Sequence, residues 1–219
     1  MLFDQVKIQS SFVINLESSV DRMEAFSLAF KDLDYVRIAA CTPTYVKQHF
    51  AQSEVLIPQE IACTESHKKI WEKVKTYPDD AWALILEDDA VPLEDFDVNS
   101  IQLTVPDTHM MFLQDSRHVF KNKDNTVKSG QGTYAYIVDN VGASKLLKAL
   151  TPQVARLDKQ IFGYAIDATD YPFPVIVDIY GMPGTHYTPL KACVSEKPLF
   201  TTGNFKSTIQ PLNREGRWR

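Results

Sequence analysis

The hydrophobic positions of the chain fall into short apolar runs that are separated by longer stretches with a helical period. Runs rich in β-forming residues predict strands over residues 12–16, 35–39, 82–86, 110–113, 134–138 and 175–179. Helical patterns predict helices over residues 18–30, 58–77, 140–150 and 158–168. We expect a loop over residues 40–58 and an irregular tail over residues 190–219. Because strands and helices alternate, the pattern predicts an α/β fold with a mostly parallel central sheet flanked by helices.

Capping and turn residues mark the ends of several of these helices. Ser18 precedes the first helix, and Asp21 follows three residues later, which is the spacing of a capping box. Pro58 opens the second helix. Asp139 or Asn140 is expected to cap the helix that runs to residue 150. The polar turns before these helices lie where sheets of this class bind their ligands.

Length and charge restrict the class of protein. A chain of 219 residues is long enough for one α/β domain, so we expect a single domain over residues 1–219. The formal net charge is −5. The chain therefore lacks the general basic field that binding to nucleic acid requires.

The cysteines and the N-terminus bear on the compartment. Three cysteines without a CxxC spacing indicate neither a disulfide framework nor a structural zinc site. The first residues lack the basic start and apolar run of a signal peptide, and no apolar stretch reaches the ~18 residues of a membrane span. We therefore expect a cytoplasmic protein without a transmembrane segment, or a piece cut from a longer chain.

Three consecutive carboxylates follow the most hydrophobic of the apolar runs. Glu87, Asp88 and Asp89 come directly after residues 82–86, at the carboxyl end of a predicted strand. Adjacent carboxylates repel one another unless a cation or solvent screens them. The (Asp/Glu)-x-Asp spacing puts Glu87 and Asp89 on one side of an extended chain, where they can share Mn²⁺ or Mg²⁺. From this motif alone, a solvated acidic turn is an equally good interpretation.

Candidates for binding a nucleotide come from the first strand, the helix after it and the second helix. They are Ile14, Asn15, Leu16, Arg22, Ser66 and His67. Arg22 can contact a diphosphate or a base. His67 lies on the apolar face of its helix. A solvated arginine and a hydrogen-bonded core histidine are the commoner interpretations of these two residues.

Further candidates lie in the second half of the chain. A glycine before a strand allows a ligand to approach the backbone. We therefore expect Gly132 and Thr133 to lie beside the bound donor. Asp158 is either a helix cap or the base that takes a substrate proton, and Asp115 competes for the second role. His186 is a candidate metal ligand, although a solvated loop histidine is the more frequent case.

In this order, the segments resemble glycosyltransferase family 25, which includes bacterial lipooligosaccharide galactosyltransferases and collagen galactosyltransferases. The resemblance covers about residues 11–175 and depends mainly on four segments: Val13-Ile14-Asn15-Leu16 with Ser19 and Arg22, Glu60-Ile61-Ala62-Cys63 with Ser66-His67 and Ile70-Trp71, Leu84-Ile85-Leu86-Glu87-Asp88-Asp89, and Gly132-Thr133 with Tyr136-Ile137. Leu157-Asp158 is similar to a further short motif of the family. The chain departs from the family pattern at Ala62, where the family has a glycine, and at Met23, where it often has a second arginine.

The resemblance implies a GT-A (Rossmann-like) fold and transfer of a hexose from a nucleotide-sugar donor, commonly linked to UDP, with inversion at the anomeric carbon. The acceptor is expected to be a hydroxyl of a glycan, glycolipid or glycoprotein. On the matching positions, Glu87 and Asp89 are implied to bind the donor and a divalent metal, and Asp88 is a further candidate for binding the donor. Asp158 is implied to be the base, and His67 is implied to line the pocket.

Two other classes of function stay open at this stage. A nucleotidyltransferase or hydrolase acting on sugar nucleotides is one. The glycine-rich basic loop typical of nucleotidyltransferases is missing after the first strand, where Asn15-Leu16-Glu17-Ser18-Ser19 stands instead. A non-catalytic module that binds nucleotide sugars or glycans is the other, and the intact acidic triplet argues against it.

Overall fold

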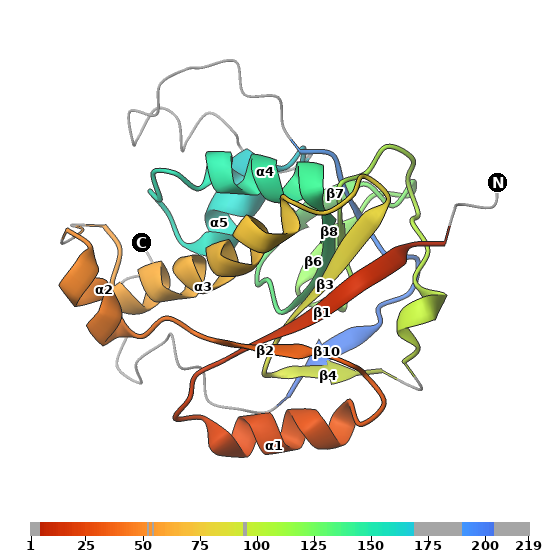
Figure 1. The fold of residues 1–219 in the computed structure, drawn as a ribbon. Coiled ribbons are helices and arrows are strands. Elements are labelled where there is room, and N and C mark those ends of the chain that lie inside the picture. Colours follow the sequence, from red (N-terminus) through yellow and green to blue (C-terminus); the bar gives the residue numbers. More distant parts are fainter. Residues whose placement is uncertain (1–4, 52, 54, 94–95, 169–189, 204–219) are drawn as a thin grey trace.

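The computed structural model describes residues 5–51, 53, 55–93, 96–168 and 190–203. A six-stranded sheet lies at the centre of the fold (Figure 1). In spatial order, its strands are β2 (Val36–Ala39), β1 (Lys7–Asn15), β3 (Ala81–Glu87), β8 (Ala135–Asp139), β5 (Met110–Phe112) and β9 (Ala192–Val194). Strand β8 is antiparallel to β3 and β5, whereas the pairs β1–β2, β1–β3 and β5–β9 are parallel. The predicted α/β fold with a mostly parallel central sheet is confirmed.

Helices cover both faces of this sheet. They are α1 (Val20–Ala29), α2 (Pro43–His49), α3 (Pro58–Val74), α4 (Asn140–Ala149) and α5 (Leu157–Gln160). In Figure 1, α3, α4 and α5 lie on one side of the sheet and α1 lies on the other. None of the helices in the described ranges has both the length and the apolar character that crossing a membrane requires.

Shorter elements complete the fold. They are the antiparallel pair β4 (Ala90–Pro92) and β10 (Phe200–Thr202), the antiparallel pair β6 (Val119–Lys121) and β7 (Val127–Gly130), a 3₁₀ turn (Val98–Ser100) and a π-helical turn (Ile161–Ala165). The β4–β10 pair joins the chain after residue 89 to the segment 200–202. Two segments that are far apart in the sequence therefore meet beside the acidic triplet.

Alternate residues of the central strands divide the hydrophobic core into two layers. Phe12 and Ile85 pack with Trp71 on the side of α3 and α4. Val13 and Leu84 belong to the opposite layer, which includes residues of α1 and β10. Each large apolar side chain that is fully buried stabilises the fold by about 1.5–3 kcal/mol. The two layers therefore hold β1 and β3 rigidly, and both strands end at the acidic triplet.

The first residues of α3 and α4 agree with the sequence, whereas the start of α1 differs and α3 ends at Val74 rather than at residue 77. Pro58 is the first residue of α3, as expected. Asp139 caps α4, since its Oδ1 accepts a hydrogen bond from the backbone N–H of Gly142 at 2.7 Å. The expectation that Ser18 caps the first helix is wrong, because Ser19 is the N-cap and its side chain makes no capping hydrogen bond.

Two segments expected to be irregular contain regular elements. Residues 40–58 include α2, which begins with Pro43 and is capped by the Thr42 hydroxyl. In this helix only Val46 is buried, so the sequence shows no apolar stripe. The tail expected over 190–219 contains β9 and β10, each only three residues long and so too short to show alternation. The strand expected over residues 175–179 lies outside the described residues.

Candidate functional site

The acidic triplet lies in the turn that links β3 to β4. Glu87 is the last residue of β3, and its backbone N–H donates to the carbonyl of Tyr134 at 2.9 Å. The backbone N–H of Asp88 donates to the carbonyl of Ile14 at 3.1 Å. Asp88 and Asp89 form a turn, so the premise that the triplet is extended is wrong. The triplet is nevertheless held firmly, because its backbone is bonded to β1 on one side and to residue 134 on the other.

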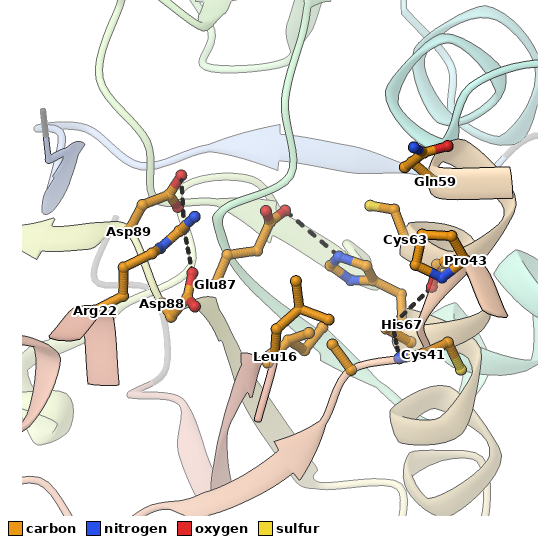
Figure 2. Close-up of a pocket in the computed structure, with 14 residues that line it drawn as sticks. Leu16, Arg22, Cys41, Pro43, Gln59, Cys63, His67, Glu87, Asp88 and Asp89 are labelled. Atoms are coloured by element: carbon orange, nitrogen blue, oxygen red, sulfur yellow. Dashed lines mark hydrogen bonds and ion pairs between the residues drawn. The ribbon is translucent and has the colours of Figure 1, made fainter. Parts of the chain in front are cut away.

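Two pockets meet at this turn. The first pocket lies between the end of β1, the start of α2 and helix α3 (Figure 2). The second pocket, of about 300 Å³, lies between α3, residues 131–134 and the start of α5. Glu87, Asp89 and Cys63 line both pockets. The carboxylates of Glu87 and Asp89 are therefore part of a wall that the two pockets share.

The residues proposed from the sequence divide between these two pockets. The first pocket is lined by Ile14, Leu16, Arg22, Ser66, His67, Glu87, Asp88 and Asp89. The second pocket is lined by Glu87, Asp89, Gly132, Thr133 and Asp158. Asn15 lines neither pocket, but its side chain contacts Asp88. His186 lies outside the described residues.

Asp88 is bound to the protein rather than turned to solvent. The Arg22 guanidinium makes a close ion pair with Asp88 Oδ1. The Asn15 amide donates to Asp88 Oδ2 at 2.6 Å. Burial raises the pKa of Asp88, and the positive charge of Arg22 opposes this shift. Both oxygens of this carboxylate are thus occupied, so Asp88 holds the turn against α1 and β1.

Asp89 has a different environment from its neighbour. Arg22 Nη2 lies 3.3 Å from Asp89 Oδ2. Asp89 Oδ1 is buried and makes no hydrogen bond within the described part of the structure. Burial and the nearby charge of Glu87 raise the pKa of Asp89 to about 7. A cation bound at Asp89 would stabilise its ionised form. The cation would offset the repulsion from Glu87 and would pair with Oδ1.

Two residues hold the Glu87 carboxylate through its oxygen Oε1. The Thr133 hydroxyl donates to Glu87 Oε1 at 3.0 Å. His67 Nε2 lies 3.5 Å from the same oxygen, and Figure 2 shows the imidazole turned toward the carboxylate. Burial alone would raise the pKa of Glu87, but His67 and Thr133 reverse the shift and lower it. Glu87 therefore stays ionised beside Asp89.

Ser66 has a structural contact of its own. Its hydroxyl donates to the carbonyl of Ala62 at 2.7 Å and accepts from the backbone N–H of Cys41 at 2.8 Å. This side chain therefore ties α3 to the segment that precedes α2. Since Cys41 lines the first pocket, the contact fixes one side of that pocket.

Asp158 faces the second pocket from the start of α5. Its Oδ2 accepts a hydrogen bond from the backbone N–H of Gly132 at 3.2 Å. Its Oδ1 accepts from the backbone N–H of Lys159 at 2.9 Å, and Arg156 Nε lies 3.5 Å from that oxygen. Gly132 has a φ of +75°, which favours glycine at this position. The contact brings Asp158 and the segment around Thr133 to one side of the second pocket.

Asp115 lies outside both pockets and is fully engaged. Arg117 Nη2 lies 2.6 Å from its Oδ2, and the Thr201 hydroxyl donates to the same oxygen at 2.7 Å. Burial would raise the pKa of Asp115, but the hydrogen bonds from Arg117 and Thr201 lower it to about 2. A carboxyl group with so low a pKa is a weak base near neutral pH. Of the two carboxylates proposed as a base, the geometry therefore favours Asp158.

Replacing Asp115 with asparagine is expected to remove part of the acid dependence of stability. The folded pKa of about 2 lies below the unfolded value of ~3.9, so this carboxylate stabilises the fold above pH ~4. That contribution is lost as the pH falls through 2. Because Arg117 is largely exposed, we expect wild type to exceed Asp115→Asn by only about 1–2 kcal/mol at pH 6. Urea unfolding at pH 6 and pH 2.5 measures this difference, and a difference equal at both values would contradict the assignment.

The carboxylate pair is suited to a cation that is shared with a substrate. Within the described ranges, no three His, Cys, Asp or Glu side chains gather into a complete metal site. Mg²⁺ and similar ions are commonly held by one or two carboxylates together with substrate phosphates. Glu87 and Asp89 fit that arrangement, because both line the same two pockets and Asp89 Oδ1 is buried without a hydrogen-bond partner.

Several residues that line the pockets were not proposed from the sequence. They are Ala40, Cys41, Pro43, Gln59, Ala62 and Cys63 in the first pocket, and Glu60, Cys63, His118, Gln131, Arg156, Leu157 and Thr202 in the second. Arg156 stands two residues before Asp158, which is a signal that the sequence offers. His118 carries no such signal, since its position depends on how β6 and β7 fold back.

Comparison with known families gives one match. The model of glycosyltransferase family 25, described as an LPS biosynthesis protein, matches residues 8–104. This segment contains β1, α3 and the acidic triplet, and so most of the first pocket. The resemblance expected from the sequence is confirmed over this segment. No curated protein sequence matches the chain.

Several solved structures match the chain at low sequence identity. A glycosyltransferase involved in glycosylation of the major capsid of PBCV-1 is 13% identical over 90% of this chain and 94% of that chain, with a TM-score of 0.43. The apo-form glycosyltransferase GlyE of Streptococcus pneumoniae TIGR4 is 14% identical over 95% of this chain and 57% of that chain, also with a TM-score of 0.43. A Drosophila β-1,4-galactosyltransferase 7 mutant in complex with manganese, UDP-Gal and xylobiose is 9% identical over 94% and 76%, with a TM-score of 0.35.

Proposed function

We propose that the chain is a glycosyltransferase that moves a hexose from a nucleotide-diphosphate sugar to an acceptor hydroxyl. The match of residues 8–104 to the model of glycosyltransferase family 25 supports this proposal. The donor is UDP-linked. The acceptor is a glycan, a glycolipid or a glycoprotein. The transfer depends on Mn²⁺ or Mg²⁺ and inverts the anomeric carbon.

One observation carries this proposal, namely that the carboxylates of Glu87 and Asp89 line two neighbouring pockets. An enzyme that joins two substrates needs two binding volumes that meet at the reacting atoms. Negative charge leaves with the nucleoside diphosphate, so groups that handle this charge belong at the junction. A shared acidic wall between two pockets meets both requirements.

The donor occupies the first pocket in this proposal. Leu16 and Ala62 offer apolar surface to a base or ribose, and Glu87 and Asp89 lie at the junction with the second pocket. Arg22 is bound to Asp88, so it acts by holding the turn and by reducing its negative charge. Glu87 and Asp89 hold the cation, which neutralises the charge on the diphosphate when it is bound.

The acceptor occupies the second pocket, next to Asp158. The acceptor oxygen forms a bond to the anomeric carbon while the bond from that carbon to the diphosphate oxygen breaks. The diphosphate leaves with the electron pair, and Asp158 takes the proton of the acceptor hydroxyl as general base. One in-line displacement of this kind inverts the anomeric centre.

Nucleotide binding in the presence and absence of metal tests the proposal. We expect the thermal stability of the protein to rise with UDP or a UDP-sugar together with Mn²⁺, and much less with either alone. A ligand at a hundredfold excess over its dissociation constant stabilises the folded state by ~2.7 kcal/mol. GDP and dTDP and their sugars serve as matched alternatives, and EDTA serves as the metal-free control.

The products separate the proposal from the other two functions. Transfer releases nucleoside diphosphate and forms a new glycoside when an acceptor is present, whereas a hydrolase releases only free sugar under the same conditions. A nucleotidyltransferase forms or cleaves the bond to the α-phosphate. Nucleotide binding without any turnover, in the presence of metal and candidate acceptors, would favour a binding module. No stabilisation by any nucleotide with metal, in a folded sample, would overturn the proposal.

A further inference from the structure

A chain of buried polar groups runs from α3 through β8 to Glu87. Trp71 Nε1 lies 2.9 Å from the hydroxyl of Tyr136, and that hydroxyl lies 2.9 Å from His67 Nδ1. His67 Nε2 then faces Glu87 Oε1 at 3.5 Å. Trp71 and Tyr136 are completely buried, and His67 is 1% exposed. The chain crosses the hydrophobic core and ends at the wall shared by the two pockets.

The surroundings of these groups are apolar. Trp71 and Tyr136 belong to the core layer on the side of α3, with Ile70, Val74 and Phe112. A phenylalanine at position 136 would fill the same space without a polar atom. A buried hydroxyl without partners is costly, so polar atoms in such a layer are normally hydrogen-bonded. The Tyr136 hydroxyl has two partners, and both belong to the chain that leads to Glu87.

The chemistry of the partners determines where the protons lie. An indole N–H only donates, so the Tyr136 oxygen accepts from Trp71. Burial raises the pKa of Tyr136 well above its usual value, so the phenol keeps its proton. The hydroxyl has no other partner than Trp71 and His67 among the described residues, so the arrangement that leaves no buried proton unpaired directs this proton to His67 Nδ1, which then accepts it. A neutral imidazole that accepts at Nδ1 carries its proton on Nε2, and this N–H points to Glu87.

His67 and Thr133 both face the same oxygen of Glu87, Oε1. Thr133 already donates to Oε1, the oxygen that His67 faces. The second oxygen of the carboxylate is then the one available to the pockets. The separation of 3.5 Å is longer than a hydrogen bond, and such contacts in unliganded sites often shorten when the substrate binds.

We propose that His67 is a positioning residue whose Nε2–H tautomer, fixed by Tyr136 and Trp71, orients the Glu87 carboxylate for metal and donor. This inference rests on the proposed function of Glu87. If Tyr136 loses its hydroxyl, His67 is free to adopt the Nδ1–H tautomer and presents a lone pair to the carboxylate. Loss of such an outer partner typically costs about 10- to 100-fold in metal affinity or activity.

The tautomer is measured directly in the protein without metal or nucleotide. The ¹⁵N chemical shifts of the His67 imidazole at neutral pH should report the Nε2–H form in the wild type. In Tyr136→Phe, which keeps the ring and removes one hydroxyl, we expect a mixture of the two tautomers. An Nδ1–H tautomer in the wild type would overturn the proposal whatever the activity of the protein.

Binding of Mn²⁺ with UDP then tests the consequence. We expect the dissociation constant measured by calorimetry to rise about 10- to 100-fold in Tyr136→Phe. Thr64→Val is the matched control, because it removes a buried hydroxyl from α3 whose one hydrogen bond among the described residues goes to the carbonyl of Glu60. The control should bind like the wild type, so a loss shared by both variants would indicate a general effect on the fold.

Two substitutions of His67 keep the test independent of how Tyr136→Phe folds. The amide of His67→Gln reaches the position of Nε2 and can still donate to Glu87, whereas the shorter His67→Asn reaches only toward Tyr136. We expect His67→Gln to bind Mn²⁺ with UDP at least about fivefold more tightly than His67→Asn. Equal affinities for the two, with wild-type binding established, would overturn the inference alone. Absence of binding in the wild type would instead overturn the proposed function and the inference together.

Discussion

Asp89→Asn is expected to lower kcat/KM for glycosyl transfer at least about a hundredfold, which corresponds to about 2.7 kcal/mol of transition-state stabilisation. The substitution keeps the shape of the side chain and removes one of the two carboxylates that face both pockets. Asp89 Oδ1 is buried without a hydrogen-bond partner in the described residues, so it is the oxygen best placed to bind a cation. Steady-state transfer or donor hydrolysis at several Mn²⁺ concentrations measures the effect.

The same substitution should not destabilise the protein in the absence of metal. The pKa of Asp89 is raised to about 7 in the fold, above the unfolded value of ~3.9, because burial and Glu87 disfavour its charge. An acid with a raised pKa makes the fold less stable as the pH rises from about 4 through 7. Asparagine carries no such charge, so at pH 8 the Tm of metal-free Asp89→Asn should equal or exceed that of the wild type.

Asp80→Asn is the matched control for this experiment. Asp80 precedes the first residue of β3, at the end of the strand opposite to Glu87, and its ion pair with Lys7 is largely exposed. The variant therefore removes the same charge without touching either pocket. Its transfer rate and its stability should stay close to those of the wild type. Near wild-type transfer by Asp89→Asn would show that Asp89 is not a metal ligand.

The sequence predicts the central strands well because burial on both faces leaves a strong pattern. The run Ala81–Glu87 is apolar almost throughout. Helices α3 and α4 cover one face of this strand, and α1 with β10 covers the other, so side chains on both faces are buried. Such continuous runs are typical of strands inside a sheet of this class. The helix α2 leaves no comparable pattern, because it buries only Val46 and lies at the surface.

The roles of adjacent acids are not visible in the sequence. Asp88 and Asp89 have the same side chain, and the spacing of the triplet does not say which one faces a ligand. Arg22, more than sixty residues earlier in the chain, makes the difference, because its guanidinium pairs closely with Asp88. The position of that guanidinium depends on how α1 packs against the sheet. This packing is a tertiary contact, so the spacing of residues in the sequence does not show it.

The choice between two candidate bases also depends on distant contacts. Asp115 is bound by the hydroxyl of Thr201, which belongs to β10 and lies 86 residues further along the chain. The sequence predicts no regular element there, so it could not predict this contact. Asp158 follows Leu157 as the resemblance to the family suggests, and the second pocket lies beside it.

Asp158→Asn is expected to lower kcat by about 10²- to 10⁴-fold, the usual contribution of a general base. The amide keeps an oxygen for the backbone N–H of Gly132, so the loop before β8 should stay in place. Donor binding should change little, because Asp158 lines the second pocket and not the first. The expected pattern is thus a loss in kcat with an almost unchanged dissociation constant for Mn²⁺ and UDP, measured by transfer kinetics and calorimetry.

Comparison with Asp115→Asn makes this result specific. Asp115 is the competing candidate, yet its carboxylate is occupied by Arg117 and Thr201. If Asp158 is the base, Asp115→Asn should keep most of the transfer activity at neutral pH. If instead Asp115→Asn loses transfer and Asp158→Asn keeps it, the acceptor must approach from the side of β10. A weaker donor affinity in Asp158→Asn would show that its bond to Gly132 shapes the first pocket, because Thr133, the next residue, holds Glu87 in the wall between the pockets.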